Sequence, residues 1–255
     1  MGGTLRVVTD PQDPAVEAFA DLVARTFPDP DLVVTAEGVR RRVAGRVTPE
    51  RIDFLLVAEE DGRLTGAAAF CYLPGPDAAF SGYLVVDRTQ RGRGWGRRLF
   101  NERARLLREA AAGLGRPGPR ALFIEVANPL RLPPDRLAAE RAAGMDPVHR
   151  RRIFRHFGFQ QVAVRYVEPP ARPGGQPVTY MDLLCLVTDP ELQRAGWLPA
   201  GMVLETLRHA WPGYIDAEAY LADLRAQVQG DRIPLVPVEG IEDDAPGAGR
   251  KVGSP

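Results

Sequence analysis

Between Tyr83 and Phe100, an apolar strand-like run leads through a glycine-punctuated loop into a long amphipathic helix. Glycine has no side chain to keep an anion from the backbone, and the first turn of a helix presents free N–H groups at its positive dipole end. Arginine side chains nearby can pair with phosphate oxygens in forked geometry. The loop and the helix start contain Arg91, Gly92, Arg93, Gly94, Gly96, Arg97 and Arg98. The segment therefore predicts a phosphate cradle between a strand and a helix.

Two common phosphate-binding patterns do not fit this loop. The dinucleotide fingerprint requires a glycine three residues after Gly94, where Arg97 stands. The nucleotide P-loop requires a Lys-Ser/Thr pair after its glycines, and none follows here. A plain strand-to-helix turn, with glycines needed only for close packing, is the alternative interpretation.

The loop resembles the pyrophosphate loop that binds acetyl-CoA in the GNAT superfamily of N-acetyltransferases. That pattern is Gln or Arg, two residues, Gly, one residue, then Gly or Ala, and Arg91, Gly94 and Gly96 satisfy it. A second motif, Arg151 to Phe159, resembles the family's late helix, which ends in an aromatic or aliphatic residue, Gly and Phe. The two motifs occur in the family's order, so the chain is identified as similar to GNAT acetyltransferases.

Apolar periodicity and turn residues predict the elements of the chain. We expect strands at 5–8, 52–59, 64–73, 80–86, 121–127, 159–167 and 178–187, with a hairpin turn at Asp61-Gly62. We expect helices at 14–26, 36–47, 95–114, 136–143, 147–157, 191–194, 200–210 and 217–228. Up to residue 187 this order resembles the GNAT fold, an α/β (α+β) fold with a mixed, largely antiparallel sheet flanked by helices.

The expected organisation is a GNAT acetyltransferase domain at 1–188, a C-terminal helical extension at 189–232 and a disordered tail at 233–255. The extension is interpreted as an elaboration or as a packing and dimerisation element, which leaves a homodimer open. The long helix at 95–114 should bury the stripe formed by Phe100, Ala104, Leu107, Ala111 and Leu114.

The composition of the chain limits the classes of partner that it is expected to bind. Lys plus Arg and Asp plus Glu both number 33, so no global basic field points to nucleic acid, which leaves only the arginine-rich helix as a weak alternative. No apolar run approaches the ~20 residues that span a bilayer, and the N-terminus does not resemble a secretory signal, so we expect a cytoplasmic protein. Cys71 and Cys185 lie in apolar runs and are interpreted as core side chains rather than as metal ligands.

The resemblance implies acetyl-CoA as co-substrate. In the family the pantetheine arm lies beside the strand that precedes the loop, here Leu84, Val85 and Val86, and a backbone N–H near Val85 or Val86 polarises the thioester. Asn128, at a strand end, is a further candidate for binding the pantetheine or the substrate, although it also suits a turn before a proline. The loop residues expected to contact the cofactor are Arg91, Gly92, Arg93, Gly94, Trp95, Gly96 and Arg97.

Glu125 is the candidate proton acceptor for the amine. It alternates with Leu122, Ile124 and Val126 and therefore faces the other side of its strand, although pairing with an arginine would explain it equally well. Many family members use a tyrosine of the late helix to protonate the departing thiolate, and Phe154 occupies that position here.

Tyr166 is the candidate that replaces this tyrosine as the catalytic acid, with Tyr83 as a second possibility. The resulting functional prediction is an acetyl-CoA-dependent N-acetyltransferase that acts on a primary amine of a small molecule or a protein. The alternative is a GNAT-fold module that binds acyl-CoA without turnover. The sequence does not identify the amine.

Overall fold

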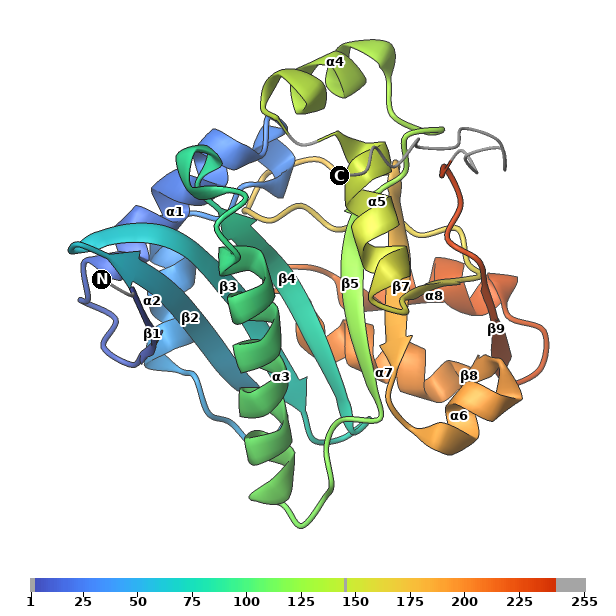
Figure 1. Ribbon diagram of the computed structural model, residues 1–255. Coiled ribbons are helices and arrows are strands. Elements are labelled where there is room, and N and C mark those ends of the chain that lie inside the picture. Colours follow the sequence, from blue (N-terminus) through green and yellow to red (C-terminus); the bar gives the residue numbers. More distant parts are fainter. Residues whose placement is uncertain (1–2, 145, 242–255) are drawn as a thin grey trace, which may run out of the picture.

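The computed structural model describes residues 3–144 and 146–241, and within them a nine-stranded sheet forms the middle layer (Figure 1). The strand order is β1-β2-β3-β4-β5-β7-β6-β9-β8. Neighbours pair in antiparallel fashion except β4 and β5, which are parallel. The strands are β1 (Thr4–Val8), β2 (Ile52–Glu60), β3 (Arg63–Leu73), β4 (Ala78–Val86), β5 (Ala121–Ala127), β6 (Gln160–Val162), β7 (Met181–Val187), β8 (Trp197–Pro199) and β9 (Arg232–Val236).

Helices cover both faces of the sheet. Figure 1 shows α3 and α5 on the near face, with α1, α2, α7 and α8 behind it. The helices are α1 (Ala15–Thr26), α2 (Ala36–Ala44), α3 (Trp95–Ala112), α4 (Pro134–Ala142), α5 (Pro147–His156), α6 (Pro190–Ala195), α7 (Ala200–Ala210) and α8 (Ala217–Gln227). Two short 3₁₀ turns, η1 (Pro30–Leu32) and η2 (Arg88–Gln90), complete the elements. The mixed, largely antiparallel α/β fold predicted from the sequence is confirmed.

Local sequence signals explain several element boundaries. Asp61 and Gly62 have φ of +51° and +73°, the left-handed conformations that a two-residue hairpin turn requires, and they join β2 to β3 as predicted. The α2 helix begins after Thr35, whose hydroxyl accepts the Gly38 N–H at 3.1 Å. Gly158, with φ of +87°, follows α5 and turns the chain into β6.

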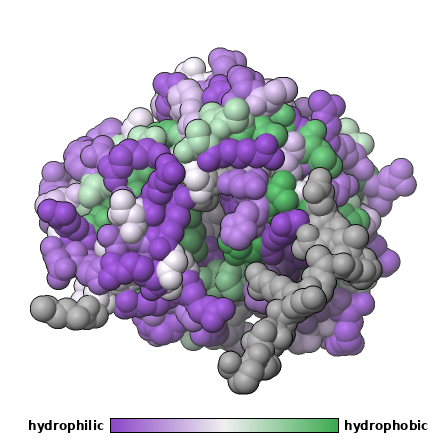
Figure 2. All heavy atoms as spheres, turned by 45° about the horizontal axis from the view of Figure 1, so that its top comes forward, coloured by the Kyte–Doolittle hydropathy of each residue, from purple (hydrophilic) through white to green (hydrophobic). Residues whose placement is uncertain are grey.

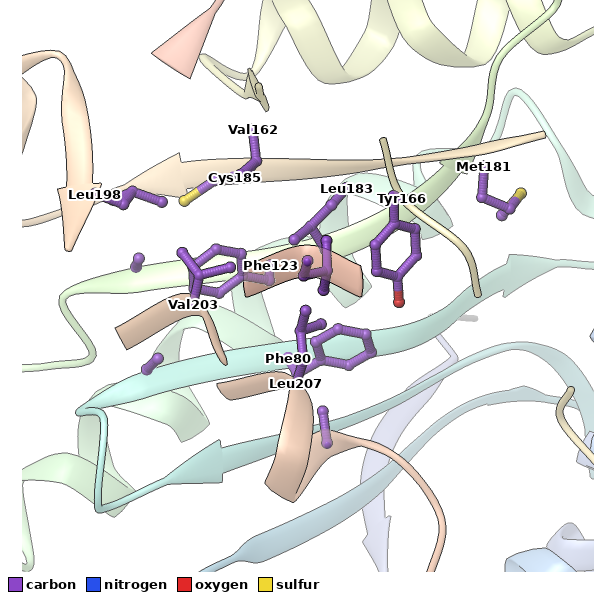
Figure 3. Packing of buried hydrophobic residues seen from close by; sticks show 14 of the residues in the cluster. Phe80, Phe123, Val162, Tyr166, Met181, Leu183, Cys185, Leu198, Val203 and Leu207 are labelled. Atoms are coloured by element: carbon purple, nitrogen blue, oxygen red, sulfur yellow. The ribbon is translucent and has the colours of Figure 1, made fainter. Parts of the chain in front are cut away.

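Alternation along β5 divides the core between the two faces of the sheet. Leu122, Ile124 and Val126 pack in the cluster beneath α3, and Phe123 packs in the cluster that includes α7 and α8. Figure 3 shows this second cluster, which includes Phe123, Leu183 and Tyr166. Strand geometry thereby directs Glu125 to the α7 face, as the sequence pattern predicts.

The buried face of α3 differs from the predicted stripe. It consists of Trp95, Leu99, Arg103, Leu106, Leu107 and Ala111. Leu114, the last member of the predicted stripe, lies beyond the end of the helix and is 51% exposed. The apolar pattern was phased one residue too late because it excluded the arginine at 103, so a buried charge was overlooked.

The C-terminal half also differs from expectation. The strand expected at 159–167 is reduced to Gln160–Val162, because the chain then leaves the sheet in irregular structure. Arg232–Val236 forms β9, which pairs with β6 and β8, so the first four residues of the segment expected to be a disordered tail (233–236) belong to the sheet. Residues 242–255 of that prediction lie outside the described residues. Both cysteines are buried and free, which confirms their interpretation as core side chains.

Candidate active site

A gap opens between β4 and β5 because their pairing stops halfway. The parallel ladder joins Ala78–Ser81 to Ala121–Ile124, and no pairing of the two strands follows it in the described structure. The register of β4 against β3 shifts beyond Ser81, so Gly82 is an extra, bulged residue. Figure 2 looks onto this end of the molecule and shows a hollow with hydrophobic residues inside and hydrophilic residues around it. The gap contains a cavity of about 70 Å³ lined by Gly82, Leu84 and Glu125, among others.

The free edge of β4 presents backbone donors to this gap. In an antiparallel ladder the hydrogen bonds of a strand alternate between its two edges. The N–H of Asp87 donates to the Thr65 carbonyl of the β3 side at 2.9 Å. The N–H groups of Val86 and Leu84 therefore face the β5 side, so of the two predicted donors the alternation favours Val86 over Val85.

The glycine loop has the geometry of an open cradle. Gly92 and Gly94 have φ of +79° and +83°, and a Cβ at either would meet no atom within 4 Å. Gly94 is the N-cap of α3 and caps no N–H with a side chain, and the first helical hydrogen bond runs from the Arg98 N–H to the Gly94 carbonyl. The N–H groups of Trp95, Gly96 and Arg97 precede that bond and are available to an anion. The open space and the free N–H groups fit a ligand that carries phosphate groups.

The arginines of the cradle do not all face a ligand. Arg91 donates to the carbonyl oxygens of Val86 at 3.3 Å and Gly144 at 2.5 Å, which ties the loop to the segment before α5. Arg93 forms an ion pair with Glu60 at 2.6 Å. Arg97 is exposed and bonds to none of the described residues, so it is the loop arginine best placed to meet phosphate.

Two other predicted cofactor residues lie in structural positions. The side chain of Trp95 is 3% exposed in the core beneath α3, so only its backbone N–H belongs to the cradle. Asn128 is 2% exposed; its amide donates to Asp182 at 2.9 Å and its carbonyl oxygen accepts the Leu130 N–H at 2.9 Å. The side chain of Asn128 therefore holds a turn, the alternative that its position before a proline suggested.

Glu125 and Tyr166 are brought together on the α7 side of the gap. The Tyr166 hydroxyl donates to Glu125 Oε1, and the Trp211 indole donates to the Tyr166 oxygen at 3.2 Å. Glu125 lines the cavity, while Tyr166 is completely buried and does not line it. Tyr166 thus orients the carboxylate and does not face the gap, which differs from its expected role as an acid toward the thiolate.

The carboxyl groups at this site hold protons more tightly than usual. Burial raises the pKa of Glu125 to about 7, although the Tyr166 hydrogen bond and the Arg42 charge oppose it. Burial raises the pKa of Glu168 well above its usual range, and the charges of Glu125 and Asp29 add to that. Glu168 Oε2 is buried with no hydrogen-bond partner in the part of the chain described. Glu125 is therefore poised to exchange a proton near neutral pH.

Sequence reasoning missed Glu168 and Arg103, which both line the cavity. Glu168 lies in a Pro-rich connection with no periodic pattern to place it. Arg103 carried a signal that was not used: it stands at helical spacing with Leu99 and Leu107 on the buried face of α3.

The model of the acetyltransferase (GNAT) domain family matches residues 51–161, which include the cradle, the gap and Glu125. Together with the fold, this match identifies an acetyltransferase domain of the GNAT type within the chain. The matched part of the chain is a GNAT acetyltransferase domain. No helix in the described ranges has the length and apolar character needed to cross a bilayer.

Several solved structures are similar to the chain at low sequence identity, and one of them has a TM-score above 0.5. A GNAT-family protein from Bacteroides thetaiotaomicron has a TM-score of 0.51 and 15% identity, over 82% of this chain and 99% of that chain. The ribosomal-protein-S18-alanine N-acetyltransferase of Escherichia coli has a TM-score of 0.43 and 15% identity, over 72% and 93%. An aminoglycoside 6′-N-acetyltransferase complexed with coenzyme A has a TM-score of 0.45 and 16% identity, over 72% and 96%. No curated protein matches the chain in sequence.

Proposed function

We propose that the protein transfers an acetyl group from acetyl-CoA to a primary amine of a small molecule or a protein, by direct attack of the amine. The observation that carries this proposal is the position of Glu125. Its carboxyl group, with a pKa of about 7, lines a gap whose opposite wall is the free edge of β4. The same strand leads into the open glycine cradle.

In this proposal the cradle and the β4 edge hold the co-substrate. The N–H groups of Trp95, Gly96 and Arg97 bind the pyrophosphate at the positive end of α3, where Gly92 and Gly94 leave room for it. The bound acetyl-CoA supplies the acetyl group as a thioester. A backbone N–H turned to the gap donates to the thioester oxygen, an interaction that is worth ~3 kcal/mol when preorganised.

In this proposal Glu125 removes a proton from the amine that accepts the acetyl group. A primary amine with a pKa near ~10 is almost fully protonated at pH 7, and only the neutral form attacks. A carboxylate with a pKa of about 7 can remove the amine proton and still be largely ionised in the neutral range. Tyr166 and Trp211 hold this carboxylate in place through their hydrogen bonds.

A non-catalytic module that binds acyl-CoA is the second candidate. It is favoured by Phe154, which lines the cavity at the position of the family's proton-donating tyrosine and has no proton to give. The two candidates differ in the effect of Glu125→Gln. Loss of turnover with unchanged acetyl-CoA binding supports the enzyme, whereas absence of turnover by the wild type on a broad panel of amines supports the module. The cytoplasmic location and the homodimer stay predictions.

The first test is calorimetric titration of the protein with acetyl-CoA and with coenzyme A. We expect micromolar binding by the wild type and none by Gly94→Glu, because that variant puts a negative side chain into the open space of the cradle. Gly115→Glu is the matched control: Gly115 also has a positive φ, of +73°, and open space, but lies past the other end of α3. No binding by the wild type, or equal binding by both variants, would remove the cradle from the proposal.

A further inference from the structure

Arg103 is a buried cation that uses only part of its bonding capacity. It is 1% exposed in the middle of α3. Its Nη1 donates to Ser81 Oγ at 2.8 Å, and the guanidinium lies over the Phe100 ring at 4.8 Å. Nε and Nη2 have no hydrogen-bond partner anywhere in residues 3–144 and 146–241. These two nitrogens share one edge of the guanidinium plane, so the unused donors form a fork suited to one electron-rich atom or anion.

This arrangement is costly unless a ligand completes it. Buried donors are seldom left unpaired, and a buried charge without a counter-ion destabilises a fold. An apolar side chain at position 103 would fill the same space in the α3 core without that cost. The retained charge therefore indicates that something negative meets Arg103 in the working protein.

Arg103 stands where β4 and β5 part. Its partner Ser81 is the last residue of β4 that pairs with β5, opposite Ile124. Arg103 lines the same cavity as Glu125 and Phe154. It approaches the gap from the α3 face of the sheet, whereas Glu125 belongs to the α7 face. A molecule in the gap thus has a proton acceptor on one side and a cation with free donors on the other.

Acetyl transfer needs both a proton acceptor and a group that stabilises negative charge. The amine must lose a proton, and the sulfur of coenzyme A must accept the electron pair of the breaking carbon–sulfur bond. We propose that Arg103 stabilises this departing thiolate, in the place of the tyrosine hydroxyl that Phe154 cannot provide. This inference rests on the acetyl transfer proposed above and deepens it.

The step balances in atoms and charge. The step starts from the neutral amine, whose earlier ammonium proton has passed through Glu125 to solvent. The amine nitrogen forms a bond to the acetyl carbon, and the proton that it then loses passes to Glu125. The carbon–sulfur bond then breaks, and its electron pair stays on sulfur as a thiolate beside the guanidinium of Arg103. The products are the amide, protonated Glu125 and the thiolate, which later exchanges protons with solvent.

The test compares coenzyme A with desulfo-coenzyme A, which lacks only the thiol, by calorimetric titration from about pH 6 to about pH 9. A cation near the sulfur lowers the thiol pKa on binding, by ~1 or more. The affinity for coenzyme A relative to desulfo-coenzyme A should therefore rise several-fold over this range in the wild type, because a thiol pKa lowered by ~1 sets a limit of about tenfold. In Arg103→Met this rise should disappear, while desulfo-coenzyme A binds as before. Arg103→Lys, which keeps the charge, should retain part of it.

Other charged groups line the same cavity and require a control. Glu125 and Glu168 would oppose a thiolate, and Arg150 pairs with Glu140. Arg108→Met removes a different arginine of α3, one that does not line this cavity, and should leave the pH dependence unchanged.

Three outcomes would overturn the inference. The first is an affinity ratio in the wild type that does not change with pH, a comparison that needs no variant to fold. The second is an equal rise in Arg103→Met. The third is weaker binding of desulfo-coenzyme A by Arg103→Met, since Arg103 would then hold the pantetheine arm and not the sulfur. If the wild type binds neither ligand, the proposed function itself fails, which is a distinguishable result.

Discussion

At the scale of single residues, Glu125 is held by a chain of hydrogen bonds that starts at Trp211 and passes through Tyr166. Trp211 is 7% exposed and Tyr166 is completely buried, so water does not compete for these bonds. These hydrogen bonds limit the Glu125 carboxylate to one orientation. The bond that Tyr166 donates to it favours the ionised form of Glu125. The same contacts therefore both position Glu125 and keep its pKa from rising further.

The activity should depend on the protonation of Glu125. Its pKa is raised to about 7, so the base is protonated at lower pH, and kcat/KM should increase as pH rises through about 7. Glu125→Gln should lose roughly 10²- to 10⁴-fold in kcat, the usual contribution of a general base. Tyr166→Phe removes a bond that favours the ionised carboxylate, so its profile should move to higher pH.

Both variants are measured as kcat/KM against pH with an accepted amine. Tyr72→Phe is a useful control, because Tyr72 also donates to a carboxylate, that of Asp77 at 2.5 Å, but belongs to the cluster beneath α3. A Glu125→Gln enzyme with the rate and the pH profile of the wild type would exclude Glu125 as the base.

The sequence predicted those site residues whose role follows from their immediate neighbours in the chain. The cradle is visible because its glycines adjoin a strand and a helix, and Glu125 because alternation along one strand sets its face. Tyr166, the partner of Glu125, is 41 residues away, and Trp211 is 45 residues beyond Tyr166, so only the folded chain brings them together. Arg103 was missed because hydrophobic periodicity counts apolar residues, and a charged residue on the buried face interrupts that count.

At the scale of elements, a buried polar network connects α5 to β7. Arg151, which is completely buried, pairs with Asp182 at 2.8 Å and donates to Gln161 of β6 at 3.0 Å. Asn128, just after β5, donates to the same carboxylate. The network fixes the ends of β5 and β7 and the helix that borders the gap, so it supports the site without touching it.

Removing one charge of this network should be far more damaging than removing an exposed pair. Asp182→Ala leaves the Arg151 guanidinium buried without its counter-ion, and we expect a loss of roughly 3–5 kcal/mol in the free energy of unfolding. Arg105→Ala breaks the exposed pairs with Glu102 and Glu109 and should cost less than about 1 kcal/mol. Urea unfolding of the two variants measures both, and similar losses would contradict this account of the network.

Element boundaries followed the sequence where a turn or cap signal was present. The β2–β3 hairpin at Asp61-Gly62 and the start of α3 after Gly94 agree with the predictions. The strand expected at 159–167 was too long, because apolar residues such as Tyr166 enter the core from irregular chain and mimic a strand pattern. Periodicity reports burial, and burial alone does not specify a strand.

At the scale of the whole molecule, the segment after residue 188 completes the core. Leu198, Val203 and Leu207 pack in the same cluster as Phe80 and Phe123 of the central strands (Figure 3). The α7 helix covers the ends of β3 and β4, and Trp211, directly after it, bonds to Tyr166. The predicted extension therefore acts as a packing element, while its role in dimerisation stays untested.

Shortening the chain at two places should separate these roles. A chain that ends at residue 188 would expose the apolar face that α7 and α8 cover, and we expect it to be insoluble or readily digested by protease. A chain that ends at 241 keeps every described element and should melt as the full chain does. Limited proteolysis and thermal melting test this. A stable, soluble 1–188 fragment that binds coenzyme A would show that the GNAT domain folds alone.

The tryptophans also make the protein an optical reporter of its own site. Trp95 begins the helix that follows the cradle, with the Arg98 guanidinium 4.1 Å from its ring, and Trp211 donates to the tyrosine that holds Glu125. The third, Trp197, lies away from both, under Arg232. Indole emission responds to nearby charge and hydrogen bonding. In a Trp197→Phe protein the tryptophan fluorescence would come only from Trp95, beside the glycine loop, and from Trp211, beside Tyr166 and Glu125. Cofactor arrival and base protonation could then be followed as separate spectral changes, without any attached dye.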